Sequence, residues 1–228
     1  MKITIITLFP EMFKGPFEYS IIKRAIDKKL VSINFINLRN FGIGKHKVVD
    51  DTPYGGGNGM VLRVDVLDKA IESSRDKKVN KKYEKVILLT AGGEQFNQNL
   101  AKKLSGLKHL IIVCGHYEGF DERIKNFIDM EISVGDFILT GGEIPAMLIA
   151  DSVLRLVKGV IKEGSADNES FSPYLEYPQY TKPAEYGKLK VPEILKSGNH
   201  EKIEEWKKNE SLKITSKLRP DLLKTKRD

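Results

Sequence analysis

Short apolar runs separated by longer amphipathic segments run through the first two-thirds of the chain. The apolar runs are rich in β-branched side chains and are bounded by polar residues or glycine; they lie at residues 3–8, 86–89 and 110–113. Runs of this length and composition are typical of buried parallel strands. We therefore expect a sheet whose central strands are covered on both faces.

Helical periodicity fills the intervals between these runs. Apolar residues recur at spacings of three and four over 64–74, 99–104, 121–128 and, most clearly, 144–157. In the last of these segments Met147, Leu148, Val153 and Leu154 supply the apolar positions. Alternation of strand and helix signals predicts an α/β domain with a parallel sheet.

Two glycine-containing segments mark a candidate small-molecule site: the first holds a strand-like apolar run between Gly135 and Gly141-Gly142, and the second follows the expected strand at 110–113. Residues 133–145 contain the pair Gly141-Gly142 just before a helix with Pro145 in its first turn, and residues 114–119 follow the strand at 110–113. Glycine lets backbone groups approach a ligand that a Cβ would block. Loops after parallel strands meet at the carboxyl edge of the sheet. Neither loop has the P-loop or Rossmann spacing, so a site of another kind is expected.

A third glycine-rich segment, residues 50–60, carries four glycines in the five positions 55–59. Such a segment is either a plain surface loop or a flexible element that contacts another molecule. Asp50 and Asp51 precede it and Arg63 follows it, which favours a binding role.

The regular pattern ends between residues 164 and 182, where small polar residues, Pro173 and Pro178 predict a linker or mobile loop. Short helical pieces are expected beyond it, at 192–196, 201–208 and 212–223. A small apolar core for these helices is available from Ile203, Trp206, Leu212, Leu218 and Leu222. The last part of the chain therefore reads as a compact helical domain.

Charge gives a modest indication of the partner. The net charge is +7 and the isoelectric point is about 9.2. From Tyr174 onward there are 13 Lys and Arg against 9 Asp and Glu, a net +4. A basic surface favours a polyanionic partner, although a merely solvated lysine-rich surface gives the same count.

Several functional classes are disfavoured by composition. The single cysteine, Cys114, excludes an internal disulfide and fits a reducing cytoplasm. The four histidines are scattered, so we expect no protein-held metal site. The apolar runs are far shorter than the roughly 18 residues of a membrane span, and no membrane association is expected.

Two side chains outside the glycine loops are candidates for chemistry. Arg155 lies on the helix that follows Gly141-Gly142, which predicts a place near the ligand; the alternative is a surface ion pair with Asp151 one turn earlier. Glu169 lies in the linker, where a carboxylate is usually just solvated. It becomes functional only if the loop folds over a substrate.

Taken together, these segments resemble the bacterial tRNA guanine-N(1)-methyltransferase family, TrmD, of the SPOUT class. The resemblance runs nearly from end to end in matching order and spacing. In the first part of the chain it rests on Leu8-Phe9-Pro10-Glu11-Met12-Phe13, Val49-Asp50-Asp51, Pro53-Tyr54-Gly55-Gly56-Gly57, Gly59-Met60, Gly115-His116-Tyr117-Glu118-Gly119 and Asp121-Glu122-Arg123. It continues with Gly135-Asp136, Gly141-Gly142-Glu143, Pro145-Ala146-Met147, Asp151-Ser152-Val153, Ser170-Phe171, Tyr180-Thr181, Pro183 and Ser197-Gly198-Asn199-His200.

The resemblance implies both a fold and an activity. The fold is a parallel-sheet SPOUT domain with a C-terminal trefoil knot at 1–162, a flexible linker at 163–173 and a small all-helical tRNA-binding domain at 174–228. The knot is an exception to the rule that chains are un-knotted. The activity is transfer of a methyl group from S-adenosylmethionine to N1 of the guanosine just 3′ of the tRNA anticodon, which protects the reading frame. The family works as a cytoplasmic homodimer with an active site between subunits.

The resemblance also assigns residues to the site. Glu169 becomes the general base and Arg155 the group that stabilises negative charge on guanine O6. Magnesium is added as a candidate ion during the transfer. The cofactor-binding residues are expected to be Leu88, Leu89, Thr90, Gly115, Tyr117, Glu118, Gly119, Ser133, Val134, Gly135, Asp136, Phe137, Ile138, Leu139, Gly141, Gly142 and Pro145.

Two positions depart from the family pattern. The family's base is an aspartate in an Asp-Ser-Phe triplet, and here that position is Glu169, with Asp167 as the fallback candidate. Where the family commonly has Pro-Gln-Gly, this chain has Ala91-Gly92-Gly93. Two alternatives therefore stay open: an RNA-binding protein of this fold without turnover, and a SPOUT methyltransferase that acts on a different RNA.

Overall fold

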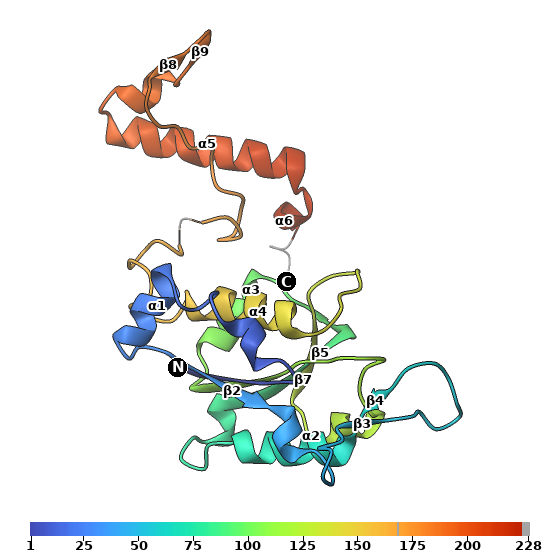
Figure 1. The fold of residues 1–228 in the computed structure, drawn as a ribbon. Coiled ribbons are helices and arrows are strands. Elements are labelled where there is room, and N and C mark those ends of the chain that lie inside the picture. Colours follow the sequence, from blue (N-terminus) through green and yellow to red (C-terminus); the bar gives the residue numbers. More distant parts are fainter. Residues whose placement is uncertain (168, 225–228) are drawn as a thin grey trace. The chain divides into compact units, whose positions relative to one another are not determined.

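The computed structural model describes residues 1–167 and 169–224, and the chain forms two compact units, Met1–Lys162 and Glu163–Asp228. The first unit is built on a five-stranded parallel sheet with strand order β2-β1-β6-β5-β7 (Figure 1). Its strands are β1 (Lys2–Thr7), β2 (Ser32–Asn37), β5 (Glu84–Gln95), β6 (His109–Val113) and β7 (Met130–Ser133). The expected α/β fold with a parallel sheet is confirmed.

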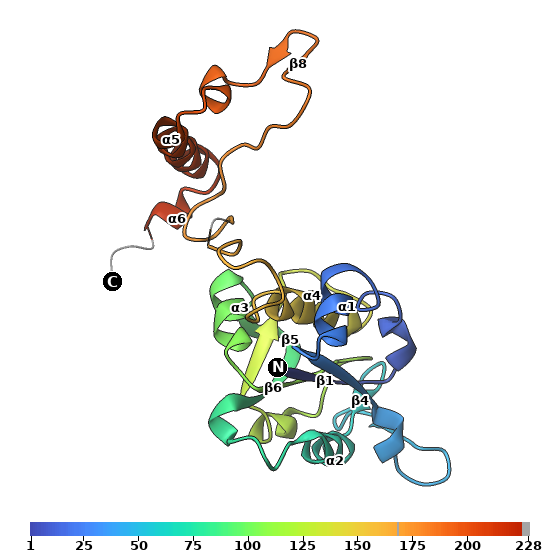
Figure 2. The same cartoon turned by 90° about the vertical axis from the view of Figure 1, so that its left-hand side faces the viewer.

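Helices cover both faces of this sheet (Figure 2). One face packs against α1 (Ser20–Asp27), α3 (Gln98–Ser105) and α4 (Glu143–Leu154), and the other packs against α2 (Val64–Ser74). Successive strand residues point to opposite faces, so Ile5 joins the first core while Ile6 joins the second. Both cores bury β-branched and leucine side chains completely, which explains why the central strands are uninterrupted apolar runs.

Three shorter helical turns and a strand pair complete the part of this unit that positions the site. The turns are 3₁₀ helices η1 (Pro10–Phe13), η2 (Leu38–Phe41) and η3 (Lys81–Tyr83); the antiparallel pair is β3 (Asp50–Asp51) with β4 (Val61–Leu62). Strand β2 was not predicted, because its alternating polar residues give no apolar run at this sheet edge. Strand β7 was not predicted either: the strand-like run expected between Gly135 and Gly141 is a loop that follows β7.

Two boundaries differ from the sequence prediction. Strand β5 continues past Leu89 to Gln95, with a register shift between Leu89 and Glu94 where it pairs with β7. At Gly93 any Cβ would collide with the backbone of Ile132, so glycine permits this extension. The helix expected at 121–128 is only a 3₁₀ helix, η4 (Glu122–Asn126). It ends early because Asp129 N already donates to Val86 O at 2.9 Å, drawing the chain into β7.

A buried polar network joins the amino ends of three neighbouring strands. The His109 side chain is fully buried; its Nδ1 lies 2.8 Å from Glu84 Oε2 and its Nε2 lies 2.9 Å from Thr4 Oγ1. The same Glu84 carboxylate accepts from Asp76 N at 2.9 Å. A carboxylate only accepts, so Nδ1 donates to Glu84 and Nε2 accepts from the Thr4 hydroxyl. Burial is the main cause that lowers the pKa of His109, against the raising effect of Glu84.

This network predicts a loss of stability in mild acid. The pKa of His109 in the folded chain lies below its ordinary 6.5. Just below pH 6.5 His109 is therefore protonated in the unfolded chain but still neutral in the folded chain. We expect the unfolding free energy to fall as the pH drops below about 6.5. Denaturant titrations at pH 8, 7, 6 and 5 test this. The fall should be smaller in His109→Gln, and an equal fall in both proteins would refute the role of His109.

The second unit is organised around one long helix. It contains a hairpin of β8 (Glu185–Tyr186) and β9 (Leu189–Lys190), a 3₁₀ turn η5 (Glu193–Lys196), and helices α5 (His200–Leu218) and α6 (Asp221–Lys224). The expectation of an all-helical unit is therefore wrong, since the hairpin is part of it. The prediction of two separate helices at 201–208 and 212–223 is also wrong, because one helix, α5, spans His200–Leu218. No Gly or Pro interrupts α5 until Pro220, which ends the helix.

The core of this unit differs from the expected one as well. Leu218 is exposed, and Thr215 is the residue of α5 that is buried. Its hydroxyl accepts from Leu175 N at 3.0 Å, and the Ser211 hydroxyl donates to Leu175 O at 2.6 Å, so the preceding chain is fastened to α5. Trp206 packs with Tyr177 and Tyr180 at centroid distances of 6.5 and 6.4 Å. In the described parts of both units, no helix combines the length and apolar character needed to cross a membrane.

Candidate functional site

The carboxyl ends of β5, β6 and β7 bring three glycine-containing segments together. The segment after β6 begins at Cys114, the segment after β7 leads through Gly141-Gly142 into α4, and β5 contributes Thr90, Ala91 and Gly92. Gly142 N donates to Gly115 O at 2.8 Å, which ties the first two segments to each other. The sheet edge predicted from the sequence is therefore where the two glycine loops meet.

Close backbone approach explains the glycines at this junction. A Cβ on Gly142 would lie 2.6 Å from Gly115 N and 2.8 Å from Cys114 Cα. A Cβ on Gly141 would lie 2.5 Å from Glu143 Oε2 and 2.7 Å from His116 Nδ1. At Gly142 the close atoms belong to the backbone, which cannot move aside, so this position requires a residue without a side chain. At Gly141 they are side-chain atoms, which would have to shift to admit a Cβ. The loops enclose a space beside this junction.

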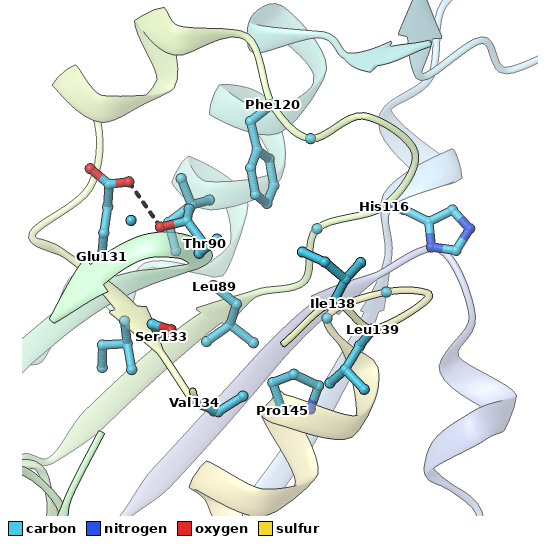
Figure 3. Close-up of a pocket in the computed structure, with 18 of the residues that line it drawn as sticks. Leu89, Thr90, His116, Phe120, Glu131, Ser133, Val134, Ile138, Leu139 and Pro145 are labelled. Atoms are coloured by element: carbon cyan, nitrogen blue, oxygen red, sulfur yellow. Dashed lines mark hydrogen bonds between the residues drawn. The ribbon is translucent and has the colours of Figure 1, made fainter. Parts of the chain in front are cut away.

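That space is a cavity of about 440 Å³, within the range of roughly 300–1,000 Å³ usual for small-molecule sites. Figure 3 shows Leu89, Ile138, Leu139 and Pro145 in its middle part, with Thr90 and Glu131 at one end and His116 at the other. Every residue predicted to bind the cofactor lines this cavity except Asp136. The position of Asp136 follows from a tight turn in which Phe137 N donates to Gly135 O at 3.0 Å.

Sequence reasoning missed part of the lining. The additional residues are Ala91, Gly92, His116, Phe120, Asp121, Glu122, Ile124, Lys125, Glu131, Ile132 and Thr140. Most of them adjoin predicted residues in the same strand ends and loops. The η4 residues could not be found in this way, because the expected helix at 121–128 gave no reason to place them at a site.

One end of the cavity carries a charged cluster. Thr90 Oγ1 donates to Glu131 Oε2 at 3.1 Å, and Lys125 Nζ lies 3.3 Å from Glu131 Oε1 and 2.7 Å from Glu122 Oε1. The hydrogen bonds to Glu122 and then Glu131 raise the pKa of Lys125, which keeps the ammonium group charged. The cavity is thus apolar in its middle and polar at this end, as a ligand with an aromatic ring and polar groups requires.

His116 marks the other end. Its ring packs against Phe9 and Tyr117 at centroid distances of 5.0 and 4.8 Å. Its Nδ1 is buried and has no hydrogen-bond partner in the part of the chain that the structure describes. Buried polar atoms are nearly always paired, so an orphaned one beside a cavity is a sign of a group supplied from outside the chain.

Cys114 and Glu143 are buried residues next to the junction of the two loops. Glu143, in the first turn of α4, is buried and accepts a hydrogen bond of 2.7 Å from the Thr7 hydroxyl at the end of β1. Burial, and secondly the charge of Glu143, raise the pKa of the Cys114 thiol well above its usual range. The thiol therefore stays neutral, and Cys114 is a packing residue rather than a nucleophile.

The glycine-rich loop at 52–60 is framed by ion pairs. Arg63 Nη1 lies 2.9 Å from Asp51 Oδ2, and its Nε and Nη2 both lie 3.1 Å from the Asp65 carboxylate. Arg63 thus binds Asp51 and Asp65 within the chain, which favours a structural role for Arg63. The loop itself ends against the cavity wall, because Glu118 N donates to Met60 O at 3.0 Å.

Arg155, one of the two candidate catalytic residues, does not line the cavity of its own chain. Arg155 ends α4, whereas Gly142 at the opposite end of this 12-residue helix borders the cavity. At about 1.5 Å per residue the two ends are roughly 18 Å apart. The expectation that Arg155 projects near a ligand held by its own chain is therefore wrong. Glu169 belongs to the second unit and is half-buried.

Fold and cavity together define an α/β protein with a glycine-lined small-molecule site at the carboxyl edge of a parallel sheet. The sequence profile of the family described as tRNA (Guanine-1)-methyltransferase TrmD matches residues 1–225. The chain belongs to this family.

Curated relatives agree over nearly their whole length. A tRNA (guanine-N(1)-)-methyltransferase of Dictyoglomus turgidum is 54% identical over 98% of this chain and 90% of that protein. The protein of the same name from Carboxydothermus hydrogenoformans is 53% identical over 99% of this chain and 88% of its own. A third, from Bacillus pumilus, is 52% identical over 98% and 92%.

Proposed function

We propose that the protein transfers a methyl group from S-adenosylmethionine to N1 of the guanosine immediately 3′ of the anticodon in tRNA. Family membership over residues 1–225 supports the reaction and the substrate class. The observation that carries the proposal is the cavity at the junction of the 114–119 and 133–142 loops, because it offers backbone groups to a ligand at the sheet edge.

The residues of the cavity fit this cofactor. Apolar side chains in its middle suit an adenine ring, and the main chain of the loops at 114–119 and 133–142, which lines the cavity, suits its ring nitrogens and ribose. The orphaned Nδ1 of His116 supplies one further polar group. When bound, S-adenosylmethionine supplies a methyl group that its sulfonium makes electrophilic.

The close backbone contacts at Gly142 predict that a larger residue there lowers the affinity for S-adenosylmethionine. In Gly142→Ala the added methyl collides with the backbone at Gly115 and Cys114. Overpacking of this kind costs about 1–3 kcal/mol, and where the loop moves out of its binding position to relieve it, we expect affinity to fall by about 5- to 150-fold, since 1.4 kcal/mol is tenfold. Isothermal titration calorimetry with S-adenosylmethionine measures the loss.

Gly106→Ala is the matched control for this variant. Gly106 also stands at a helix terminus, where a Cβ would meet only Lys103 O at an ordinary 3.5 Å. It should bind S-adenosylmethionine as the wild type does. Unchanged affinity in Gly142→Ala would show that the loop junction does not form the cofactor site.

Glu169 and Arg155 are assigned to the chemical step. Guanine N1 carries a proton that must leave as N1 attacks the methyl carbon. The Glu169 carboxylate accepts this proton, while the electron pair of the breaking carbon–sulfur bond remains on sulfur. Negative charge that spreads to O6 is stabilised by the Arg155 guanidinium. Glutamate differs from the family's aspartate by one methylene, so the same reach requires a small retraction of its loop.

The position of Arg155 favours a homodimer in which it acts on the guanine bound at the cavity of the partner. Within one chain Arg155 is a helix length away from the cavity. A second observation points the same way. Helix α4 exposes Ile144 and Leu148, and it packs beside η1, at which Met12 and the preceding Phe9 are exposed. An apolar surface of this kind suits a second copy of the chain. We extend the proposal to the trefoil knot of the SPOUT class in the first unit.

We assign tRNA binding to the second unit and leave magnesium without a protein-held site. The net charge of +4 beyond Tyr174 supports the former, because tRNA is a polyanion. Among residues 1–167 and 169–224 no three His, Cys, Asp or Glu side chains are grouped so as to hold a metal ion. No step of the mechanism is therefore routed through magnesium. A tRNA substrate places the reaction in the cytoplasm.

Methyl incorporation from labelled S-adenosylmethionine tests the proposal. One tRNA transcript carries guanosine 3′ of the anticodon and a parallel transcript carries adenosine there. We expect label in the first alone, recovered as 1-methylguanosine. Label in another nucleoside would identify a SPOUT enzyme with a different target. Absence of label despite cofactor binding would favour an RNA-binding protein without turnover.

A further inference from the structure

A basic loop precedes the strand pair that borders the cavity. Between Asp27 and Asp50 the chain contains no acidic residue, yet it carries Lys28, Lys29, Arg39, Lys45 and Lys47. We call residues 42–48, whose tip is Lys45-His46-Lys47, the basic loop. All three tip residues are exposed, and no ion pair within residues 1–167 and 169–224 engages either lysine.

The basic loop is held in one shape by its backbone. Ile43 N donates to Val48 O at 2.8 Å and Val48 N donates to Ile43 O at 3.0 Å, forming an antiparallel bridge. Lys47 N donates to Gly44 O at 3.2 Å across the turn. A Cβ on Gly42 would collide with the carbonyl of Lys47, so the two sides of the loop touch. The lysines therefore project from a closed frame, which lowers the entropy lost when they bind.

Hydrogen bonds connect this frame to the cavity wall. Val49, fully buried, leads from the basic loop into β3, and Arg63 N donates to Val49 O at 3.0 Å. β3 pairs with β4, and Leu62 of β4 bridges Phe120 and donates from its N to Gly119 O at 3.0 Å. Gly119 and Phe120 line the cavity. One strand pair thus separates the basic loop from the site that the target base must reach.

We propose that the basic loop binds the phosphate backbone of the tRNA beside the nucleotide that enters the cavity, with Lys45 and Lys47 each paired to a phosphate. The inference rests on tRNA as the substrate. Two unpaired ammonium groups on a rigid turn match a chain of phosphates spaced along a backbone. A base presented to the cavity from outside also brings its flanking phosphates close to this strand pair. The contact would fix the register of the tRNA without reading its sequence.

Salt dependence of tRNA binding distinguishes this contact from general attraction. The full-length wild type and Lys45→Gln/Lys47→Gln are titrated with unmodified tRNA transcript at several KCl concentrations. Each phosphate contact contributes about 0.7–0.9 to the slope of log K against log salt, so the variant should lose about 1.4–1.8 of the slope. The affinity for S-adenosylmethionine should be unchanged.

Two further variants complete the design. Lys77→Gln/Lys78→Gln removes the same charge from exposed, neighbouring lysines on the loop that follows α2, at the amino edge of the sheet, and should keep the wild-type slope. Lys45→Arg/Lys47→Arg keeps the charge and should keep both affinity and slope.

The outcomes separate the loop from the function as a whole. An unchanged slope in Lys45→Gln/Lys47→Gln, or an equal loss in the control pair, overturns the contact while the wild type still methylates tRNA. A loss of cofactor affinity in the loop variant also overturns it, because the effect would then pass through β3 and β4. If the wild type neither binds nor methylates tRNA, the proposed function itself fails.

Discussion

A Glu169→Ala protein should bind S-adenosylmethionine and tRNA as the wild type does and lose about 10²-fold or more of its methyl transfer, the usual scale for removal of a general base. The reason is local: without the carboxylate, no group of the chain accepts the N1 proton as the new bond forms. Single-turnover transfer with enzyme in excess over tRNA measures this step directly. Equilibrium binding of each substrate, measured separately, shows whether the loss lies in chemistry.

Two neighbouring substitutions sharpen the result. Glu169→Asp restores the residue of the family pattern and should retain activity, since it keeps the carboxylate at a reach one methylene shorter. Asp167→Ala removes the nearest alternative carboxylate and should leave the chemical step intact. If Asp167→Ala rather than Glu169→Ala abolishes transfer, the base has been assigned to the wrong residue. If Glu169→Ala mainly weakens tRNA binding, the side chain positions substrate instead.

The central sheet could be predicted because its strands are buried on both faces. Burial on two sides requires apolar residues at consecutive positions, and the runs that became β1, β6 and the first half of β5 satisfy this. Strand β2 lies at the sheet edge, where alternate residues meet solvent. Its polar positions interrupt the apolar run, so the strand was not predicted. The same physical rule therefore explains both the success and the omission.

The ends of strands and helices were predicted wrongly where contacts between distant parts of the sequence override the local preference of the chain. Gly92-Gly93 looks like a strand end, yet pairing with β7 carries β5 on to Gln95. The segment at 121–128 has a helical pattern, yet the bond from Asp129 N to Val86 O ends it within a few residues. In the second unit neither Gly nor Pro lies between Lys208 and Leu212, and α5 continues through Asn209 and Ser211, because the Ser211 hydroxyl donates to Leu175 O and packs this turn against the preceding chain.

The candidate site was predictable to the extent that glycine marks close backbone approach. Gly115 and Gly142 were identified as loop glycines, and they touch each other beside the cavity. Thr90 was predicted, but Lys125 and Glu131 were not, because the contact of these three separate segments depends on sheet order. Arg155 follows Gly142 by only 13 positions in the sequence, but helix α4 lies between them and holds Arg155 a helix length away from the cavity.

A Leu148→Asp protein should be a folded monomer without methyl transfer. Leu148 is 46% exposed on α4, one turn after Ile144, so a charge there is tolerated by the isolated chain. In a dimer formed through this surface the same carboxylate would be buried without a partner, at a cost of about 3–5 kcal/mol. Light scattering after size exclusion measures the mass, and circular dichroism confirms the fold. Tyr83→Asp, a comparable change at the amino edge, should remain a dimer.

Complementation between two impaired proteins tests whether the site is shared. Gly142→Ala weakens the cofactor cavity and Glu169→Ala removes the base, so each homodimer lacks one part of every site when the S-adenosylmethionine concentration is kept well below the dissociation constant of Gly142→Ala. If the parts come from different subunits, a mixed dimer contains one intact site, built from the cavity of the Glu169→Ala chain and the Glu169 of its partner. Random exchange then restores at most about a quarter of wild-type transfer, since half of the dimers are mixed and each has one good site of two. Activity no higher than that of the separate proteins would place cavity and base in the same chain.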